Sequence, residues 1–367
     1  SSGEDSGKYQ IIKPEAYYNM YKKRIGIIFG GRSAEHDVSL KSAAAVIRNL
    51  NSDKFVPVYI GINRRGEWKR FGGSVDLIEK GIWETHAAHL NTEELKDIID
   101  FALPILHGPY GEDGKIQGFL ETLGIPYGGC GVLASAVCMD KQMFKDVLRH
   151  KGFPVVRSMC LTCQNEPDES VLDKIEGELG FPCFVKPANM GSSVGISKAA
   201  DRHQLACALR LAASYDSRVV IEEFVQCREL ETAVMGNIDP EASEVGEIIP
   251  SAEFYDYEAK YSGCGRPSEL HIPAGITDGD RRQIRRLAVE AYKAACCSGY
   301  ARVDFFKDKT TGKIYINEIN TIPGFTDKSM FPLLWSSYGV SFPKTIERII
   351  ELGYERYHAE NNRQAEL

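Results

Sequence analysis

Residues 302–329 read RVDFFKDKTTGKIYINEINTIPGFTDKS, and this stretch predicts two strands joined by a hairpin connection. The segments YARVDFF and IYINEI are apolar or alternate, and KDKTTGK between them has the polar residues and glycine of a turn. Because successive strand side chains point to opposite faces, Glu318 and Asn320 share a face, onto which antiparallel pairing can bring Asp304. Such oxygen donors are typical of a Mg²⁺ site completed by water and phosphate. The stretch therefore predicts a nucleoside triphosphate site, and a hairpin with solvated polar side chains is the alternative.

Length and charge limit the class of protein. The chain has 367 residues, of which 43% are hydrophobic, and a formal net charge of -7. It is long enough for two or three domains with their own cores, and its negative charge argues against nucleic-acid or anionic-membrane partners. No apolar run approaches the roughly 20 residues that span a bilayer, and the first residues lack the apolar core of a secretory signal. We therefore expect a cytoplasmic protein.

The ten cysteines are irregularly spaced and mostly have apolar neighbours. Reduced thiols are expected rather than a disulfide framework. Cys160 and Cys163 form a CxxC pair, but no second close pair or histidine pair lies nearby, so we predict neither a zinc site nor a redox site there.

The N-terminal half has the pattern of a parallel sheet. Residues 1–23 show no clear period and are left out of the fold argument. RIGIIFG, a glycine turn, a helix over residues 38–50 and FVPVYIGI predict a βαβ unit, followed by the strand DFALPILHG, the loop HGPYGEDG, the helix IQGFLETLG and the short strand IPYGG. The turn lacks GxGxxG spacing, which disfavours a dinucleotide site. Glu35, near the helix start, would repel a pyrophosphate but could receive an ammonium group; simple helix capping is the alternative.

The next part carries two lysines and a serine-glycine loop. One helical stretch, LASAVCMDKQMFKDVLRHKG, is expected to contain Lys141 and to end near residue 152. The strand FPCFVKP ends at Lys186, and in the loop ANMGSSVGIS two glycines flank two serines, so that the backbone could fold over an anion. A flexible turn is the alternative. No GKS or GKT follows, which excludes a P-loop. The strand RVVIEEFV then carries Glu222 and Glu223.

Eight motifs in order carry a resemblance to a known family: GGRSAEHDVSL, LHGPYGEDGKIQGFLE, MDK, FVKPANMGSSVGISK, IEEF, EFYDYEAKY, GYARVDFF and NEINTIPGFTDKS. From residue 24 to about 352 the chain resembles the D-alanine:D-alanine ligases of the ATP-grasp fold. The resemblance implies an α/β (α+β) protein, with a Rossmann-like parallel-sheet domain followed by two ATP-grasp subdomains. The expected parts are an N-terminal arm or expression remnant (1–23), a substrate domain (24–129), a central subdomain (130–222), a catalytic domain (223–355) and a polar tail (356–367). A homodimer is also implied.

The same resemblance implies a nucleotide site for ATP and two Mg²⁺ ions, for which Mn²⁺ could substitute. The ATP-binding residues would be Lys141, Lys186, Ser193, Glu222, Glu223, Val225, Glu229 and Lys260, and the metal ligands Asp304, Glu318 and Asn320. The lysines would hold phosphates, the segment around Glu223 the adenine, and Glu229 the ribose. Many relatives have lysine at position 223, which leaves room for a backbone contact there but not for a side-chain contact.

The amino-acid site is implied in the same way. Its catalytic residues would be Glu35, Ser192, Tyr261, Arg302, Gly324 and Ser329, and its substrate-binding residues His107, Met330 and Tyr255. Glu35 would take the ammonium of the first D-alanine and His107 would face its carboxylate. Arg302 and the Gly324 N–H would form an oxyanion hole, and Ser329 and Met330 would bind the second D-alanine. Lys260 and Tyr261 would belong to a loop that closes the site. Individual positions could instead be structural, as turn or core residues.

The activity implied is ATP-dependent ligation of two D-alanines through an acyl phosphate, for peptidoglycan precursors. The apolar Met330 favours D-alanine over D-serine or D-lactate as the second substrate, although the segment around Arg266 departs from the common pattern. The alternatives are a D-alanyl-D-serine ligase, another ATP-grasp carboxylate–amine ligase, or a nucleotide-binding protein without turnover. The last would be expected to lack Arg302 or a metal ligand, and all of these residues are present.

Overall fold

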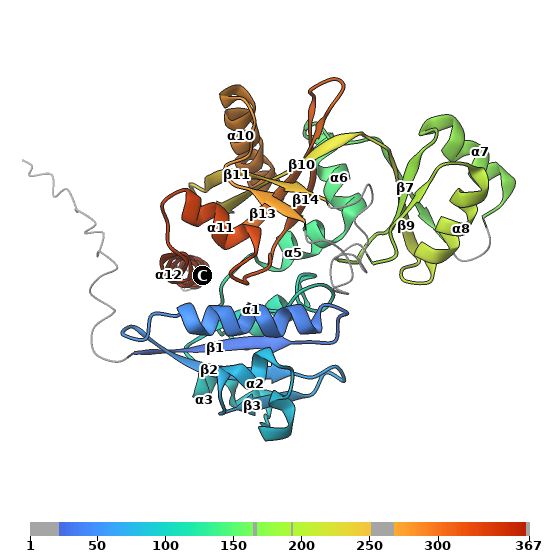
Figure 1. Cartoon of the computed structure of the whole chain (residues 1–367). Helices are drawn as coiled ribbons and strands as arrows, with labels where there is room; N and C mark the ends of the chain where they lie inside the picture. The colour runs from blue at the N-terminus through green and yellow to red at the C-terminus, as the bar shows by residue number, and fades with distance from the viewer. Residues whose placement is uncertain (1–21, 164–166, 192–193, 251–267, 365–367) are drawn as a thin grey trace, which may run out of the picture.

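The computed structural model describes residues 22–163, 167–191, 194–250 and 268–364. Each of its three sheets is built from consecutive strands, and Figure 1 shows the N-terminal sheet below the C-terminal one, with the central sheet to one side. The described residues exclude five of the predicted site residues, Ser192, Ser193, Tyr255, Lys260 and Tyr261, and also Arg266.

The N-terminal sheet has the strand order β4-β3-β2-β1-β5. Its elements are β1 (Lys23–Gly30), α1 (His36–Asn49), β2 (Phe55–Ile62), β3 (Trp68–Phe71), α2 (Val75–Glu79), β4 (Ala87–His89), α3 (Leu95–Ile98), β5 (Phe101–Ile105) and α4 (Lys115–Thr122), with short 3₁₀ helices at Trp83–His86 and Thr92–Glu94. The predicted parallel pairing of β1 with β2 and β5 is present, and β3 and β4 extend the sheet antiparallel. The predicted strand IPYGG forms only an isolated bridge from Tyr127 to Ala102, because two glycines follow and turn the chain away.

The central sheet is antiparallel, in the order β6-β9-β7-β8. Its part of the chain contains α5 (Val132–Met139), α6 (Lys141–His150), β6 (Ser158–Thr162), α7 (Glu169–Glu178), β7 (Cys183–Pro187), β8 (Ser197–Ala199), α8 (Arg202–Ala213) and β9 (Arg218–Glu223). Leucine, isoleucine and alanine side chains of α7 and α8 pack on one face of the sheet and form a separate core with it.

The single helix predicted over this region was wrong, because α5 and α6 are separate helices with a break at Asp140. The Asp140 backbone is extended, and its carboxylate accepts a hydrogen bond from Met143 N at 2.9 Å, which caps α6. Arg218 of β9 pairs with the same carboxylate. Lys141 therefore lies at the first position of a new helix and not within a continuous one.

The C-terminal sheet is antiparallel, in the order β12-β11-β10-β13-β14. Its elements are β10 (Cys227–Met235), β11 (Glu241–Ile249), β12 (Glu269–His271), α10 (Asp278–Ala294), β13 (Tyr300–Asp308), β14 (Ile314–Asn320), α11 (Met330–Ser337) and α12 (Phe342–Gln364). α12 runs past residue 356, where a polar tail was predicted to begin, and Arg356 donates to Tyr127 O at 3.3 Å.

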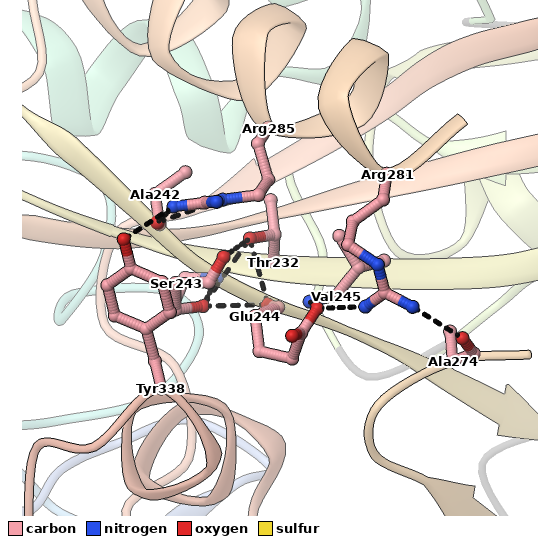
Figure 2. Close-up of polar contacts among 10 residues, drawn as sticks. Thr232, Ala242, Ser243, Glu244, Val245, Ala274, Arg281, Arg285 and Tyr338 are labelled. Atoms are coloured by element: carbon pink, nitrogen blue, oxygen red, sulfur yellow. Dashed lines mark hydrogen bonds and ion pairs between the residues drawn. The ribbon is translucent and has the colours of Figure 1, made fainter. Parts of the chain in front are cut away.

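Arginines of α10 fasten β11 to its neighbours, as Figure 2 shows. Arg281 pairs with Glu244, and Arg285 donates to Ala242 O at 2.7 Å and to Tyr338 Oη at 2.8 Å. Since Tyr338 is the C-cap of α11, Arg285 links α10 both to β11 and to the C-terminal end of α11. It holds in place the helix that begins with the predicted substrate residue Met330.

The N-terminal sheet and the C-terminal helices share one hydrophobic core. Ile27 and Phe29 of β1 belong to the same buried cluster as Phe331 of α11 and Ile349 of α12. α12 also contacts α1, and in Figure 1 it is seen nearly end-on above one end of that helix. The N-terminal sheet and the C-terminal helices therefore form one packed unit beside the central sheet.

Glu347 of α12 links this helix to the N-terminal domain through hydrogen bonds, and its pKa predicts how stability changes in acid. Its carboxylate accepts from Asn51 Nδ2 at 2.5 Å, Lys344 Nζ at 2.7 Å and Lys54 Nζ at 3.2 Å. Burial raises the pKa of Glu347, but these donors outweigh burial and lower it from 4.5 to about 2. A pKa below the unfolded value means that the stabilisation is complete above about pH 4.5 and is lost as the pH falls towards about 2.

We therefore expect Glu347→Gln to lower the free energy of unfolding near neutral pH and to cost progressively less below about pH 4.5. Urea unfolding of both proteins at a series of pH values measures the difference. A difference that stays constant across the acid range would contradict the assignment.

Candidate functional site

The predicted oxygen donors meet on the β13–β14 hairpin. Asp304 is paired across the strands with Glu318, and Arg302 with Asn320, so the antiparallel pairing predicted from the sequence is present. Asn320 Nδ2 donates to Asp304 Oδ2 at 2.9 Å. Two carboxylates and a carboxamide on adjacent strand positions fit a hard divalent cation such as magnesium.

Arg302 is fixed beside these donors by two carboxylates. Its Nε and one terminal nitrogen each lie 2.7 Å from an oxygen of Asp304, and Nε lies 2.9 Å from Glu231 Oε2. Burial lowers the pKa of Arg302, but Asp304 and Glu231 outweigh burial and raise it, which keeps the guanidinium charged. Glu231 was not predicted from the sequence; it is the last charged residue of β10, which reads CRELETAVM.

Lysines converge on the same region from the central part of the chain. Lys141 Nζ donates to Met190 O, in the serine-glycine loop, at 2.5 Å. Lys186 Nζ lies 2.7 Å from one oxygen of Glu222, and Lys145 Nζ lies 2.8 Å from the other. Burial raises the pKa of Glu222, but the attraction of the two lysines outweighs burial and lowers it strongly. Lys145 was missed, although it follows Lys141 by four residues and so shares its helix face.

Glu318 lies within reach of these cations. Removal from water raises the pKa of its carboxyl, and the positive charges of Lys141, Lys186 and Arg302 lower it by more. Glu318 is therefore held ionised on the hairpin. The arrangement brings acidic donors and cationic side chains together, as a bound metal–triphosphate requires.

The segment predicted to hold the nucleoside is partly engaged within the protein. The carboxylate of Glu223 accepts from Arg157 Nε at 2.7 Å and from Arg157 N at 2.8 Å. Both carboxylate oxygens of Glu222 bind lysines. A contact of Glu222 or Glu223 with a base would therefore be made by backbone groups. Val225 follows β9 and is half-buried, and Glu229 lies exposed on β10.

Glu35 is buried where three segments meet. It is the N-cap residue of α1, but its side chain makes no capping hydrogen bond, so helix capping does not explain it. It is only 9% exposed, and its Oε2 lies so close to Gly191 that a Cβ there would come within 2.6 Å. The carboxylate therefore joins the N-terminal domain to the start of the serine-glycine loop.

Both ring nitrogens of His107 have protein partners. Nδ1 lies 2.9 Å from Ile322 O, and Nε2 lies 3.0 Å from Ser42 Oγ. Burial lowers the pKa of His107, which favours a neutral ring that donates through Nδ1 and accepts through Nε2. His107, which was predicted to face a substrate carboxylate, anchors the backbone that leads to Gly324.

Glu112, which the sequence argument missed, lies close to Glu35. Its Oε2 accepts from Gly108 N at 2.9 Å, and its carboxyl also accepts from the Ile322 N–H. Removal from water and the charge of Glu35 raise its pKa to about 8 despite these donors. The sequence feature that could have indicated Glu112 is a carboxylate in the glycine-rich loop HGPYGEDG. Ile322 is thus held on one side by Glu112 and on the other by His107.

The loop after β14 brings Gly324 and Ser329 together. A Cβ at Gly324 would lie 2.8 Å from Ser329 Oγ, so a side chain there would displace the serine. Ser329 Oγ accepts from Thr326 N at 3.0 Å. Ser329 is the N-cap residue of α11, but its side chain makes no capping hydrogen bond. Met330 is only 4% exposed and packs in the shared core.

Other candidate sites have little support in the described ranges. The described ranges contain no cluster of three or more His, Cys, Asp or Glu side chains arranged for a metal, and none of the cysteines in these ranges forms a disulfide. Cys160 and Cys163 are half-buried free thiols. No described helix is both long and apolar enough to cross a membrane.

Comparisons with known proteins identify the family of the chain. The N-terminal family description, "D-ala D-ala ligase N-terminus", matches residues 24–130, and "D-ala D-ala ligase C-terminus" matches residues 147–351. A D-alanine–D-alanine ligase of Acetivibrio thermocellus is 48% identical, with 92% of this chain and 97% of that protein covered. One of Geobacillus thermodenitrificans is 45% identical, with 92% and 96% covered.

Solved structures agree as well. The VanG D-Ala:D-Ser ligase from Enterococcus faecalis has a TM-score of 0.82 at 37% identity and covers 91% of this chain and 100% of its own. The D-alanine–D-alanine ligase from Coxiella burnetii has a TM-score of 0.83 at 32% identity, with 93% and 96% covered. The chain therefore belongs to the D-alanine–D-alanine ligase family and has the ATP-grasp fold of these enzymes.

Proposed function

We propose that the protein joins two D-alanines to D-alanyl-D-alanine, with conversion of ATP to ADP and phosphate, for peptidoglycan precursors. The observation that carries the proposal is the hairpin on which Arg302, forked onto Asp304, stands beside Glu318 and Asn320. It combines a metal-type donor set with a fixed cation for an acyl oxyanion. The family relationship supports the use of ATP and D-alanine.

In the first step, a carboxylate oxygen of one D-alanine attacks the γ-phosphorus, and the bond to the ADP oxygen breaks. Lys141 and Lys186 would hold the phosphates. Asp304, Glu318 and Asn320 would hold magnesium, which neutralises phosphate charge when it is bound. Glu35 would receive the ammonium of this D-alanine.

In the second step, the amine of the other D-alanine attacks the acyl carbon, loses a proton, and phosphate leaves as the C–O bond breaks. Arg302 and the Gly324 N–H would stabilise the oxyanion. The close approach of Gly324 to Ser329 supports a shared site for the acyl oxygen and the acceptor carboxylate. Glu35, Ser192 and Tyr261 are the residues we propose for positioning the amine or relaying its proton.

D-Alanine is the second substrate we favour, because Met330 places an apolar side chain at the start of α11. D-Serine is the second candidate, since the VanG ligase named for it is 37% identical to this chain. We also propose a homodimer in the cytoplasm, where ATP and free amino acids are available, and a requirement for Mg²⁺ that Mn²⁺ could meet.

Phosphate release by the purified protein tests the function. We expect release with ATP, Mg²⁺ and D-alanine, a dipeptide product by mass spectrometry, and no release with L-alanine. Adding D-serine or D-lactate to D-alanine should leave D-alanyl-D-alanine as the main product. EDTA should stop the reaction and Mn²⁺ should restore it. Absence of D-alanine-dependent release would refute the proposal, and a dominant mixed product would favour the second candidate.

A further inference from the structure

Lys145 is buried next to the site, where the mechanism above gives it no role. Its side chain is 1% exposed, and its ammonium lies 2.8 Å from Glu222 Oε1 and donates to Asn317 O at 3.1 Å. Glu222 is 2% exposed and also binds Lys186. One carboxylate on β9 therefore bridges a lysine of α6 and a lysine of β7, and Lys145 extends the bridge to the backbone of β14 next to Glu318.

The charges in this bridge do not cancel. When both lysines are charged, Glu222 offsets one of their two positive charges, so one positive charge remains. Without Lys145, Glu222 would be left with Lys186 alone, and that pair would be neutral. A neutral, mutually bound pair attracts a phosphate far less than a lysine whose partner is already satisfied.

We propose that Lys145 is a positioning residue for the nucleotide: it takes up the charge of Glu222, so that Lys186 stays available to a phosphate group. The inference rests on the proposed ATP site. It assigns Lys145 an effect on phosphate affinity without direct contact with the nucleotide. The contact with Asn317 also links the central sheet to the strand that carries Glu318.

Calorimetric titration of the full chain with the ATP analogue AMP-PNP and with adenosine tests the proposal. We expect Lys145→Met, which keeps the apolar stem, to weaken AMP-PNP binding by about tenfold or more while adenosine affinity changes by less than about threefold. The double variant Lys145→Met/Glu222→Gln should recover most of the lost affinity, since Lys186 is then no longer neutralised. A merely structural role predicts the opposite, because a second buried substitution adds damage.

Arg149→Met is the matched control, because Arg149 lies on the same helix and its ion pair with Asp146 at 2.7 Å is exposed. It should bind AMP-PNP like the wild type. Glu222→Gln alone should bind at least as tightly as the wild type, and it decides the case if Lys145→Met does not fold. Unchanged AMP-PNP affinity in Lys145→Met, or a double variant weaker than the single one, would overturn the inference. A wild-type protein that does not bind AMP-PNP would instead refute the ATP site itself.

Discussion

Turnover should fall by about 10²- to 10³-fold when Arg302 is replaced with alanine, the size of effect expected for loss of an oxyanion donor. Arg302 is locked by two bonds of 2.7 Å to Asp304, so its remaining N–H groups are aimed before substrate arrives. Because the acyl oxygen gains its negative charge only during the reaction, kcat should fall much more than the affinity for nucleotide. Steady-state phosphate release and AMP-PNP titration measure the two quantities.

Arg302→Lys separates charge from geometry. Lysine keeps the positive charge between Asp304 and Glu231 but cannot form the planar fork, so we expect turnover to stay well below wild type. Arg228→Ala is a suitable control. Arg228 of β10 also forms a forked pair, with Glu247 of the neighbouring strand β11, at 2.6 Å. Turnover that is unchanged in Arg302→Ala would remove the role assigned to this residue.

The second large effect is expected for Glu318→Gln, which should lower turnover by about 10²-fold or more because a metal ligand charge is lost. Its consequence for nucleotide binding depends on the metal. Without metal, removal of a carboxylate from among Lys141, Lys186 and Arg302 should strengthen AMP-PNP binding, because these cations lose a competing anion. With saturating Mg²⁺, the same change should weaken it.

Titration of AMP-PNP with and without Mg²⁺ measures this reversal, and Mn²⁺ binding followed by electron paramagnetic resonance reports the metal directly. The control is Glu290→Gln, which removes an exposed carboxylate that pairs with Arg286 on α10, and it should behave like the wild type. An equal change in affinity with and without metal would rule out a metal-ligand role for Glu318.

The sequence predicted those parts of the site that depend on local pattern. The hairpin followed from strand alternation and a polar turn, and its register brought Asp304 opposite Glu318. The motifs that carry the family resemblance supplied the family, which the comparisons confirm. These features depend on residues close in the chain or on motifs read in order.

What the sequence could not show depends on distant neighbours. Lys145 shares a helix face with Lys141, but its role as a buried ion-pair partner depends on Glu222, from a strand far along the chain. Glu231 acquires its role from Arg302 across a strand pair. Asp140 is compatible with a helix interior, and its capping bond and its pairing with Arg218 decide that the helix breaks there. Charges that face one another in the fold leave no mark on local periodicity.

The core shared by β1 and the helices α11 and α12 has a consequence for how this chain can change. Ile27 and Phe29 fall within the N-terminal family match, whereas Phe331 and Ile349 fall within the C-terminal one, yet they fill one volume. A side chain that grows or shrinks on one side must therefore be compensated on the other. At the shared core positions, the two matched regions are therefore expected to change in sequence together. An N-terminal half taken from a relative would bring a surface shaped for a different pair of helices.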